Sequence, residues 1–296
     1  MKLMTVEERC PAKINLTLQV LGRRGDGFHA LHSVVAQTQF ADTLRVSWDA
    51  SATGPDRVNI EGAEGEIEQC SVLEAFRLVR EATQVAHGRL SAELSKAIPV
   101  GAGLGGGSSD AVGALRALGR LWPEATARLD WAGLALAIGS DCPLFLRSEA
   151  VVMEGRGERI APLAAPLQAR LKGRPVILFK PPFAINTAEA YRRLAAAAVY
   201  SSEAGAVEAL REWEDSGADL PPLRNDFMRL AEGWLPTFPT LLGQLRETFG
   251  WRTQLSGSGS ACFAFPDADE SDTKGAIEVI RAAWGEDFWL VRTALK

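Results

Sequence analysis

The feature that most constrains the fold of this 296-residue chain is a glycine-rich loop, residues 101–107, in which five of seven residues are glycine. The preceding segment 90–98 is typical of an edge-like strand that stops at Pro99. Glycine lets backbone N–H groups approach an anion without side-chain obstruction, and a helix after the loop would point its positive end at the same anion. The loop therefore predicts a phosphate-binding site. A tight turn without a ligand is the alternative, but so many glycines make a turn entropically costly.

The helix after the loop is predicted from apolar residues that repeat every three or four positions. Ser108 or Ser109 is the predicted N-cap, and Pro123 ends the pattern. Either serine hydroxyl could also bind a phosphate or lie near Mg²⁺. The apolar stripe consists of Ala111, Val112, Leu115, Leu118 and Leu121.

Other glycine-rich nucleotide loops match this sequence less well. A Walker A loop requires a lysine after its last glycine, and no lysine follows here. Gly101, Gly103 and Gly106 have G-x-G-x-x-G spacing, but a dinucleotide fold needs a further strand that ends in an acid about 20 residues later. Here Trp122-Pro123 and a second helical pattern follow instead. The His-Arg-Asp and Asp-Phe-Gly motifs of protein kinases do not occur.

Both halves of the chain mix strands and helices, which predicts an α+β protein of two domains, residues 1–155 and 156–296. Segment 11–22 alternates apolar and polar side chains, as a half-buried strand does, and places Lys13 and Asn15 on one polar face. Further elements are expected as strands at 28–39 and 42–48, helices at 71–86 and 130–139, a hairpin around 155–157, a strand at 176–179, helices between 187 and 248, strands on either side of 256–260, a helix at 273–284 and a strand at 288–291.

Composition excludes several classes of protein. A net charge of -5 argues against a general nucleic-acid binder. The N-terminal residues have no apolar run typical of a signal peptide, and no stretch is long and apolar enough to cross a membrane. The four cysteines are far apart, which argues against a zinc site or disulfide framework and favours a reduced, cytoplasmic setting.

Three segments in the same order resemble the motifs of the GHMP kinase superfamily. They are Pro-Ala-Lys-Ile-Asn-Leu at 11–16, Pro-Val-Gly-Ala-Gly-Leu-Gly-Gly-Gly-Ser-Ser at 99–109 and Leu-Ser-Gly-Ser-Gly-Ser at 255–260. The resemblance implies a ribosomal S5 domain-2-like N-terminal domain, a ferredoxin-like C-terminal domain, and phosphoryl transfer from ATP with Mg²⁺. No side chain is assigned as a metal ligand, and which hydroxyl group lies near Mg²⁺ stays open. The nucleotide contacts it implies are Lys96, Pro99, Gly101, Gly103, Leu104, Gly105, Gly106, Gly107, Ser108 and Ser109.

Two further segments resemble the superfamily members that phosphorylate the 2-hydroxyl of 4-diphosphocytidyl-2-C-methyl-D-erythritol. They are Arg-Gly-Asp-Gly-Phe-His at 24–29 and Ile-Gly-Ser-Asp-Cys-Pro-Leu-Phe at 138–145. The resemblance implies a small-molecule substrate, no membrane or nucleic-acid partner, and a monomer or homodimer. The alternatives are another GHMP enzyme, of the homoserine or mevalonate kinase or diphosphomevalonate decarboxylase type, and a catalytically inactive nucleotide-binding regulator.

The resemblance assigns the chemistry to two residues. Asp141 matches the family's catalytic aspartate, which takes the proton from the substrate hydroxyl. Its alternative role is to cap a short helix opened by Cys142-Pro143, and both roles can coexist. Lys13 matches a lysine beside the attacking hydroxyl, where a positive charge stabilises the ionised aspartate and the developing alkoxide. Its alternative role is that of an ordinary solvated lysine.

The resemblance also implies residues that recognise the acceptor. His29 matches a cytosine-binding histidine, Phe28 takes the place of an aromatic residue that is often tyrosine, and Phe183 is a second stacking candidate. For His29 the alternative is a structural histidine whose hydrogen bonds are satisfied, and for the two phenylalanines it is a place in the core. The remaining substrate-binding candidates are Asn15 and Thr187, and Thr187 could instead cap its helix.

Two points of the nucleotide site stay open. Lys96 could approach the nucleotide or be a solvated strand lysine. The chain has Cys-Ser-Val at 70–72, where many relatives have Asn-Leu-Ile or Asn-Leu-Val near the adenine, so the adenine contacts are not assigned.

Overall fold

The computed structural model describes residues 3–62, 70–266 and 270–296, apart from the side chains of 270–272. The chain divides into two compact units, each assembled from separate segments. Unit 1 comprises Met1–Ala12, Phe40–Val100 and Gly105–Ser148, and unit 2 comprises Lys13–Gln39, Gly101–Leu104 and Glu149–Lys296. Because the units interleave along the chain, they do not test a boundary between consecutive domains near residue 155. That boundary stays a prediction.

Two long strands, β1 (Met4–Asn15) and β3 (His29–Asp49), contribute residues to both units. The sequence predicts a single strand over 11–22, but the structure breaks it near Leu16, whose N–H donates to the carbonyl of Val34; β2 (Thr17–Arg23) follows. The two strands expected at 28–39 and 42–48 are one continuous strand, because no glycine or proline interrupts the chain between them.

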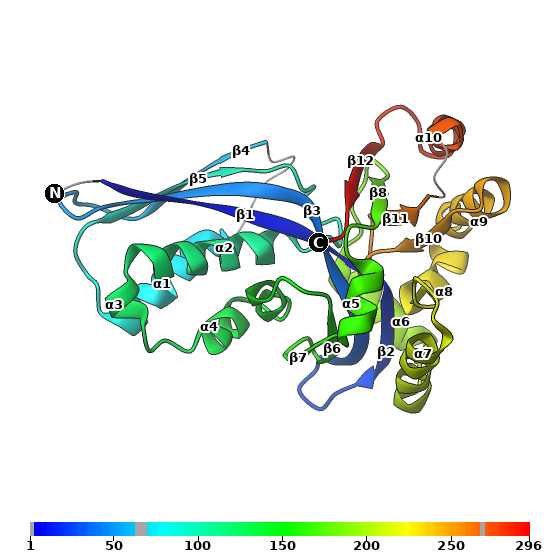
Figure 1. The fold of residues 1–296 in the computed structure, drawn as a ribbon, viewed down its shortest axis with the longest axis horizontal. Coiled ribbons are helices and arrows are strands. Elements are labelled where there is room, and N and C mark those ends of the chain that lie inside the picture. The colour runs from blue at the N-terminus through cyan, green and yellow to red at the C-terminus, as the bar shows by residue number, and fades with distance from the viewer. Residues whose placement is uncertain (1–2, 63–69, 267–269) are drawn as a thin grey trace. The chain divides into compact units, whose positions relative to one another are not determined.

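Unit 1 packs helices against one face of its strands, as Figure 1 shows. Residues 43–49 of β3 pair antiparallel with β5, and the other side of β5 pairs in parallel with β4. The expectation that the segment before the loop is an edge-like strand is therefore wrong, because β4 covers that edge. The other elements of this unit are β4 (Arg57–Glu61), α1 (Ser71–Thr83), β5 (Arg89–Ser95), α2 (Gly106–Leu121), α3 (Pro123–Thr126), α4 (Trp131–Ile138) and the 3₁₀ helix η1 (Cys142–Leu146).

Helix α2 confirms the predicted apolar stripe, all five members of which are buried. It ends at Leu121, before Pro123, as predicted. Its start is different: the N-cap is Gly105, in the left-handed conformation, and neither Ser108 nor Ser109 caps it. The helix therefore begins inside the glycine-rich loop, because a glycine can take the positive φ that this entry into the helix requires.

Unit 2 contains a four-stranded antiparallel sheet in the order β10-β11-β8-β12. The sequence order of strand, helices, two strands, helix and strand gives the ferredoxin-like arrangement that the resemblance implies. Helices α9 and α10 lie beside each other next to these strands in Figure 1. These elements are β8 (Pro175–Lys180), α6 (Thr187–Ala197), α7 (Glu203–Ser216), β9 (Arg224–Asn225), α8 (Asp226–Trp234), α9 (Thr237–Phe249), β10 (Arg252–Leu255), β11 (Cys262–Phe265), α10 (Glu270–Trp284) and β12 (Trp289–Ala294).

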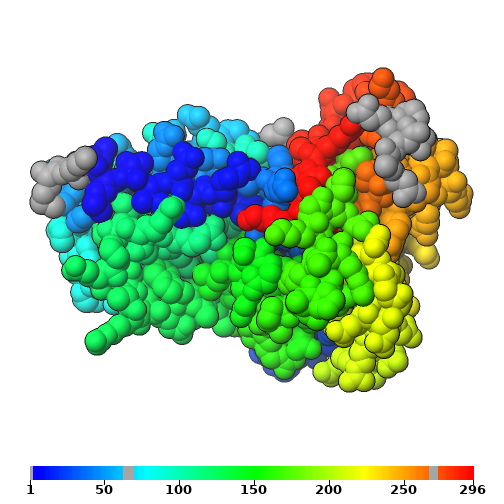
Figure 2. All heavy atoms as spheres, in the orientation of Figure 1, coloured from blue at the N-terminus to red at the C-terminus, as the bar shows by residue number. Residues whose placement is uncertain are grey.

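The remaining strands of unit 2 surround the first half of β3. Residues 31–35 of β3 pair with β6 (Val151–Gly155), which forms the predicted hairpin with β7 (Arg159–Pro162) and leads to α5 (Ala165–Leu171). β2 pairs antiparallel with β3 and parallel with β9. The C-terminal strand lies along the segment that contains α5 and β8, red beside green in Figure 2.

Candidate active site

The glycine-rich loop passes from unit 2 to unit 1 between Leu104 and Gly105. Gly101, Gly103 and Gly105 have φ values of +66°, +80° and +71°, which side chains rarely tolerate. A Cβ on Gly103 would lie 2.3 Å from the carbonyl oxygen of Ser256, so only glycine fits there. The loop thus brings bare backbone to the N-terminus of the 16-residue helix α2, the arrangement that suits an anion.

In unit 1, hydroxyl groups lie on and beside the start of α2. The Ser109 hydroxyl is buried and has no hydrogen-bond partner among the described residues. The Ser108 hydroxyl is hydrogen-bonded to the thiol of Cys142, and Ser71 donates to the carbonyl of Gly107 at 2.8 Å. Ser71 belongs to the Cys-Ser-Val segment at 70–72, which therefore contributes a contact to the loop.

Lys96 is not part of a strand, since β5 ends at Ser95. Its Nζ lies 2.5 Å from Asp42 Oδ2 and 2.6 Å from Asp110 Oδ2, and the three side chains are between 0% and 4% exposed. Burial opposes the charge of Lys96, but Asp110 and Asp42 together outweigh it and raise its pKa. The solvated alternative is therefore wrong, while a contact with the nucleotide stays a prediction. The sequence missed both aspartates, because they are 54 and 14 positions from the lysine.

Asp141 occupies the N-cap position of η1, with proline in the first turn, as the sequence suggests. Its side chain makes no capping hydrogen bond, however. The alternative role as a side-chain cap is therefore wrong. Its role as the catalytic base stays a prediction.

Lys13 lies at the meeting point of three motifs within unit 2. Its backbone N–H donates to the carbonyl of Leu104 at 2.9 Å, and its Nζ lies 3.5 Å from the position of a Cβ on Gly257. Nζ also donates to Asn15 Oδ1 at 2.6 Å, and Asn15 in turn donates to Ser33 Oγ at 2.9 Å. Lys13 and Asn15 are only 4% and 1% exposed, so the prediction of a half-buried strand is wrong, and so is the alternative that Lys13 is an ordinary solvated lysine.

The third motif, residues 256–260, is more than a hairpin. Ser256 Oγ donates to the carbonyl of Gly103 at 3.1 Å, and Ser260 Oγ donates to the carbonyl of Phe183 at 2.7 Å. Asn225 Nδ2 donates to the carbonyls of Leu255 and Gly257, both at 2.8 Å. The motif therefore joins one end of the phosphate loop to the segment of Phe183. No role was predicted for Asn225 from the sequence, because its contacts with Leu255 and Gly257 span 30 and 32 positions.

Thr187 is the first residue of α6, and its hydroxyl lies 3.0 Å from that of Ser258. The cap of this helix is Asn186, whose side chain accepts from the N–H of Glu189, so the alternative role of Thr187 as a cap is wrong. A phosphate or substrate contact of Thr187 stays a prediction.

An aromatic cluster surrounds His29. Its ring stacks on Tyr191 with centroids 4.9 Å apart, and the ring of Tyr200 lies at 6.3 Å. Nε2 is buried without a partner among the described residues, and burial, with a smaller effect of Arg23, lowers the pKa of His29. A neutral imidazole with an available ring nitrogen can recognise the polar edge of a base. The sequence did not identify the two tyrosines.

The two phenylalanines assigned to stacking are not core residues. Phe28 is 48% exposed and Phe183 is 41% exposed, so the alternative that they belong to the core is wrong. The guanidinium of Arg156 lies 5.0 Å from the centre of the Phe28 ring, a cation–π contact that the sequence did not predict. Both rings remain available for stacking on a ligand.

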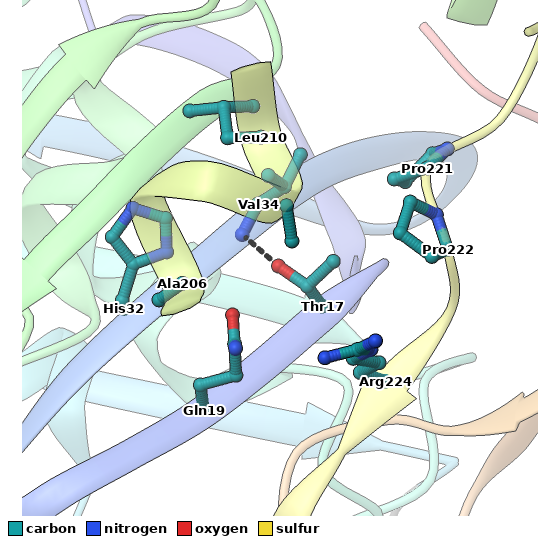
Figure 3. A pocket seen from close by; sticks show the side chains of 10 residues that line it. Thr17, Gln19, His32, Val34, Ala206, Leu210, Pro221, Pro222 and Arg224 are labelled. Carbon is teal, nitrogen blue, oxygen red and sulfur yellow. Dashed lines mark hydrogen bonds between the residues drawn. The ribbon is translucent and has the colours of Figure 1, made fainter. Parts of the chain in front are cut away.

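A cavity that none of these residues lines lies between β2, β3, β9 and α7 (Figure 3). Thr17 Oγ1 accepts a hydrogen bond from the N–H of Val34 at its wall, and His32 Nδ1 is buried there without a partner among the described residues. Its volume of about 10 Å³ is close to the space that one water molecule needs, and far below that of a ligand pocket. The cavity is therefore no substrate site.

Comparison with known proteins matches the family "GHMP kinases N terminal domain" to residues 71–149. Two bacterial relatives named 4-diphosphocytidyl-2-C-methyl-D-erythritol kinase align almost end to end. The relative from Gluconacetobacter diazotrophicus is 36% identical, covering 95% of this chain and 93% of its own, and that from Methylorubrum extorquens is 37% identical, covering 97% and 98%. The chain belongs to this kinase family.

Solved structures agree with the family assignment. A crystal structure of 4-(cytidine 5'-diphospho)-2C-methyl-D-erythritol kinase has a TM-score of 0.76 at 33% identity, covering 98% of this chain and 99% of its own. The mevalonate kinase of Methanococcus jannaschii reaches 0.66 at 14% identity, with 100% and 99% covered, which supports the fold alone. The family match and these two structures confirm the two-domain α+β GHMP kinase fold. Kinases of this family transfer phosphate from ATP. Within the described ranges, no helix is long and apolar enough to cross a membrane.

Proposed function

We propose that this chain transfers the γ-phosphoryl group of ATP to the 2-hydroxyl of 4-diphosphocytidyl-2-C-methyl-D-erythritol, a step of non-mevalonate isoprenoid biosynthesis. The observation that carries the proposal is the alignment with relatives of that name over nearly their full length, at 34–37% identity. The cytoplasm is the proposed location, and the four cysteines, none of which forms a disulfide, fit a reduced compartment.

The proposed ATP site is the glycine-rich loop and the start of α2. Its bare backbone, the helix N-terminus and the Ser109 hydroxyl, which has no partner in the described part of the chain, support binding of the phosphates. Among the described residues, no group of three acidic, histidine or cysteine side chains could hold a metal ion. A Mg²⁺ ion that is held by the nucleotide phosphates and one serine hydroxyl fits this donor set. When bound, the ion neutralises phosphate charge.

The proposed chemistry assigns the proton transfer to one residue and the stabilisation of charge to another. Asp141 accepts the proton of the substrate hydroxyl as that oxygen attacks the γ-phosphorus. The ammonium group of Lys13 stabilises the negative charge that develops on the attacking oxygen. Phosphoryl transfer needs little covalent chemistry from the protein, so positioning and charge account for most of the rate.

The proposed acceptor site uses the aromatic residues of unit 2. The imidazole of His29 hydrogen-bonds to the cytosine edge, while Phe28 and Phe183 supply stacking surfaces. Stacking on Tyr191 holds the His29 ring in place. Asn15 and Thr187 complete the proposed substrate contacts.

The activity is tested by a coupled ADP-release assay with purified protein and four acceptors: the cytidyl substrate, homoserine, mevalonate and galactose. We expect turnover with the cytidyl substrate alone. Turnover with another acceptor would replace the proposed substrate, and no turnover with any acceptor, together with ATP binding, would favour a nucleotide-binding regulator.

The cytosine site is tested by His29→Ala and Phe28→Ala, with cytidine diphosphate titrated calorimetrically. Loss of the histidine hydrogen bond or of the stacking face should each cost about 1–3 kcal/mol of binding. Affinity for a non-hydrolysable ATP analogue should stay unchanged in both variants. Phe28→Tyr, which keeps the ring, and His87→Ala, in unit 1, are the matched controls. If neither alanine variant weakens cytidine diphosphate, the cytosine assignment is wrong.

A further inference from the structure

One buried cation joins the two stretches of chain that flank the glycine-rich loop. Before the loop, Asp42 Oδ1 accepts hydrogen bonds from the N–H groups of Ala97 and Ile98 at 2.6 and 2.7 Å. After the loop, Asp110 lies in the N-terminal part of α2. Lys96 donates to the second oxygen of Asp42 and to Asp110. The residues on both sides of the loop are therefore tied together at a single point in unit 1.

The first residue of α2 packs directly against this lysine. A Cβ on Gly106 would lie 3.1 Å from Lys96 Nζ and 3.0 Å from Ile98 Cγ2, so any larger residue would have to displace them. Glycines have no side chains with which to fix a loop, and their backbone is the most mobile of all residues. A rigid phosphate site of this composition therefore depends on supports at its two ends.

We propose that Asp42, Lys96 and Asp110 form a clamp that positions the glycine-rich loop for the phosphates of ATP, and that Lys96 acts through the loop instead of touching the nucleotide. The inference rests on the proposed role of the loop in ATP binding. Two of the three ammonium protons of Lys96 are engaged by carboxylates. A lysine whose charge is compensated by two buried carboxylates acts as a positioning residue.

The clamp has a titratable member. The groups that face Asp110 are Lys96, Asp42 and the thiol of Cys10 on β1. Burial raises the pKa of Asp110, and the negative charge of Asp42 raises it further. Lys96 only partly opposes these two effects, so the pKa of Asp110 is about 7. The second oxygen, Oδ1, is buried without a partner among the described residues and can carry the proton. The clamp should therefore tighten as the pH rises through neutrality.

The test compares Asp110→Ala, which removes the bridge, with Asp110→Asn, which keeps an oxygen that can accept from Lys96. Glu93→Gln, an exposed position on β5, is the control. Calorimetry gives the Kd for a non-hydrolysable ATP analogue and for cytidine diphosphate at pH 6 to 8.5. We expect Asp110→Ala to weaken the analogue by about 10-fold or more through displacement of the loop. Asp110→Asn should restore most of the affinity and reduce its pH dependence, and cytidine diphosphate should bind all three variants like wild type.

The opposite outcome overturns the clamp. If Lys96 contacts the nucleotide itself, removal of the Asp110 carboxylate frees the ammonium group, and Asp110→Ala should bind the analogue as tightly as wild type or more tightly. Unchanged affinity in that variant therefore disproves the proposal.

A second measurement covers the case in which Asp110→Ala does not fold. Lys96→Met/Asp110→Asn removes the buried cation together with one buried anion, which limits the uncompensated charge. Without nucleotide, the amide of Ser109, which donates to the carbonyl of Gly105, should exchange hydrogen faster than in wild type. Unchanged exchange would contradict a clamp. If wild type itself bound no ATP analogue, the proposed function would fail, whereas the exchange result would still report on the clamp.

Discussion

The glycine-rich loop is held by different chemistry in the two units. In unit 1 the support is ionic: one lysine between two carboxylates, all nearly inaccessible to solvent. In unit 2 the support is neutral and consists of three hydrogen bonds to carbonyls of the loop. They run from Ala261 N–H to Ala102, from Ser256 Oγ to Gly103 and from Lys13 N–H to Leu104.

The two supports differ in how strongly they hold the loop and in whether their strength depends on pH. A buried ion pair is costly to break, because the remaining charge is left uncompensated, but its strength depends on protonation. Neutral hydrogen bonds contribute less each and do not titrate near neutral pH. We therefore expect changes in unit 1 to act on the loop in a pH-dependent way, and changes in unit 2 to act weakly and at every pH.

The largest effect is expected from a residue that belongs to neither support. Asp141→Asn keeps the shape of the side chain and removes the proton acceptor, so kcat should fall by about 10²- to 10⁴-fold. The Kd for an ATP analogue should stay close to that of wild type, since the loop is unchanged. Steady-state kinetics and calorimetry measure the two quantities. Wild-type turnover in this variant would show that Asp141 is not the base.

A smaller but still large effect is expected from the loop itself. Gly105→Val places a branched side chain at a φ of +71° and obstructs the approach of a phosphate. ATP-analogue affinity should fall by more than about 10-fold, while circular dichroism shows a folded protein. Gly233→Val, in α8 with open space around it, is the control that should keep full affinity. Equal affinity in the two variants would mean that the loop does not bind phosphate.

The ionic support should appear in the pH dependence of stability. The pKa of Asp110 is raised from 3.8 to about 7, so between these values the folded state binds more protons than the unfolded state. This residue therefore makes the free energy of unfolding fall as pH rises through that window, by at most about 1.4 kcal/mol per pH unit. Urea denaturation from pH 4 to 8 should show a smaller such fall in Asp110→Asn. Parallel curves for wild type and variant would contradict the raised pKa.

The smallest effect is expected from the neutral support. Ser256→Ala removes one hydrogen bond to Gly103, which contributes about 0.5–1.5 kcal/mol, so the Kd for the ATP analogue should rise a few-fold and equally at every pH. Ser216→Ala is the matched control, because its hydroxyl also donates to a carbonyl, that of Trp213 at the end of α7. The control should lose comparable stability without a change in ATP affinity. A strongly pH-dependent effect of Ser256→Ala would remove the distinction between the two supports.

Local patterns were sufficient where a single segment determines its own structure. The stripe of α2, the hairpin at 155–157 and the cap of α4 by Asp130, whose side chain accepts from Gly133, all depend on residues a few positions apart. The glycine loop was predicted for the same reason. The burial of the polar face of the strand at 11–22 was not predicted, because alternation shows that a strand has two faces but not what covers each of them.

The family and its motifs followed from the sequence alone, since several short segments in a fixed order are specific without any knowledge of packing. Only the tertiary structure decided what those residues do in the fold. It buried Lys13 and Lys96, left Phe28 and Phe183 exposed, and closed the edge of β5 with β4. The physical reason is that burial and ion pairing arise between residues far apart in the chain. Asp42 and Lys96 are 54 positions apart, and no local periodicity records their contact.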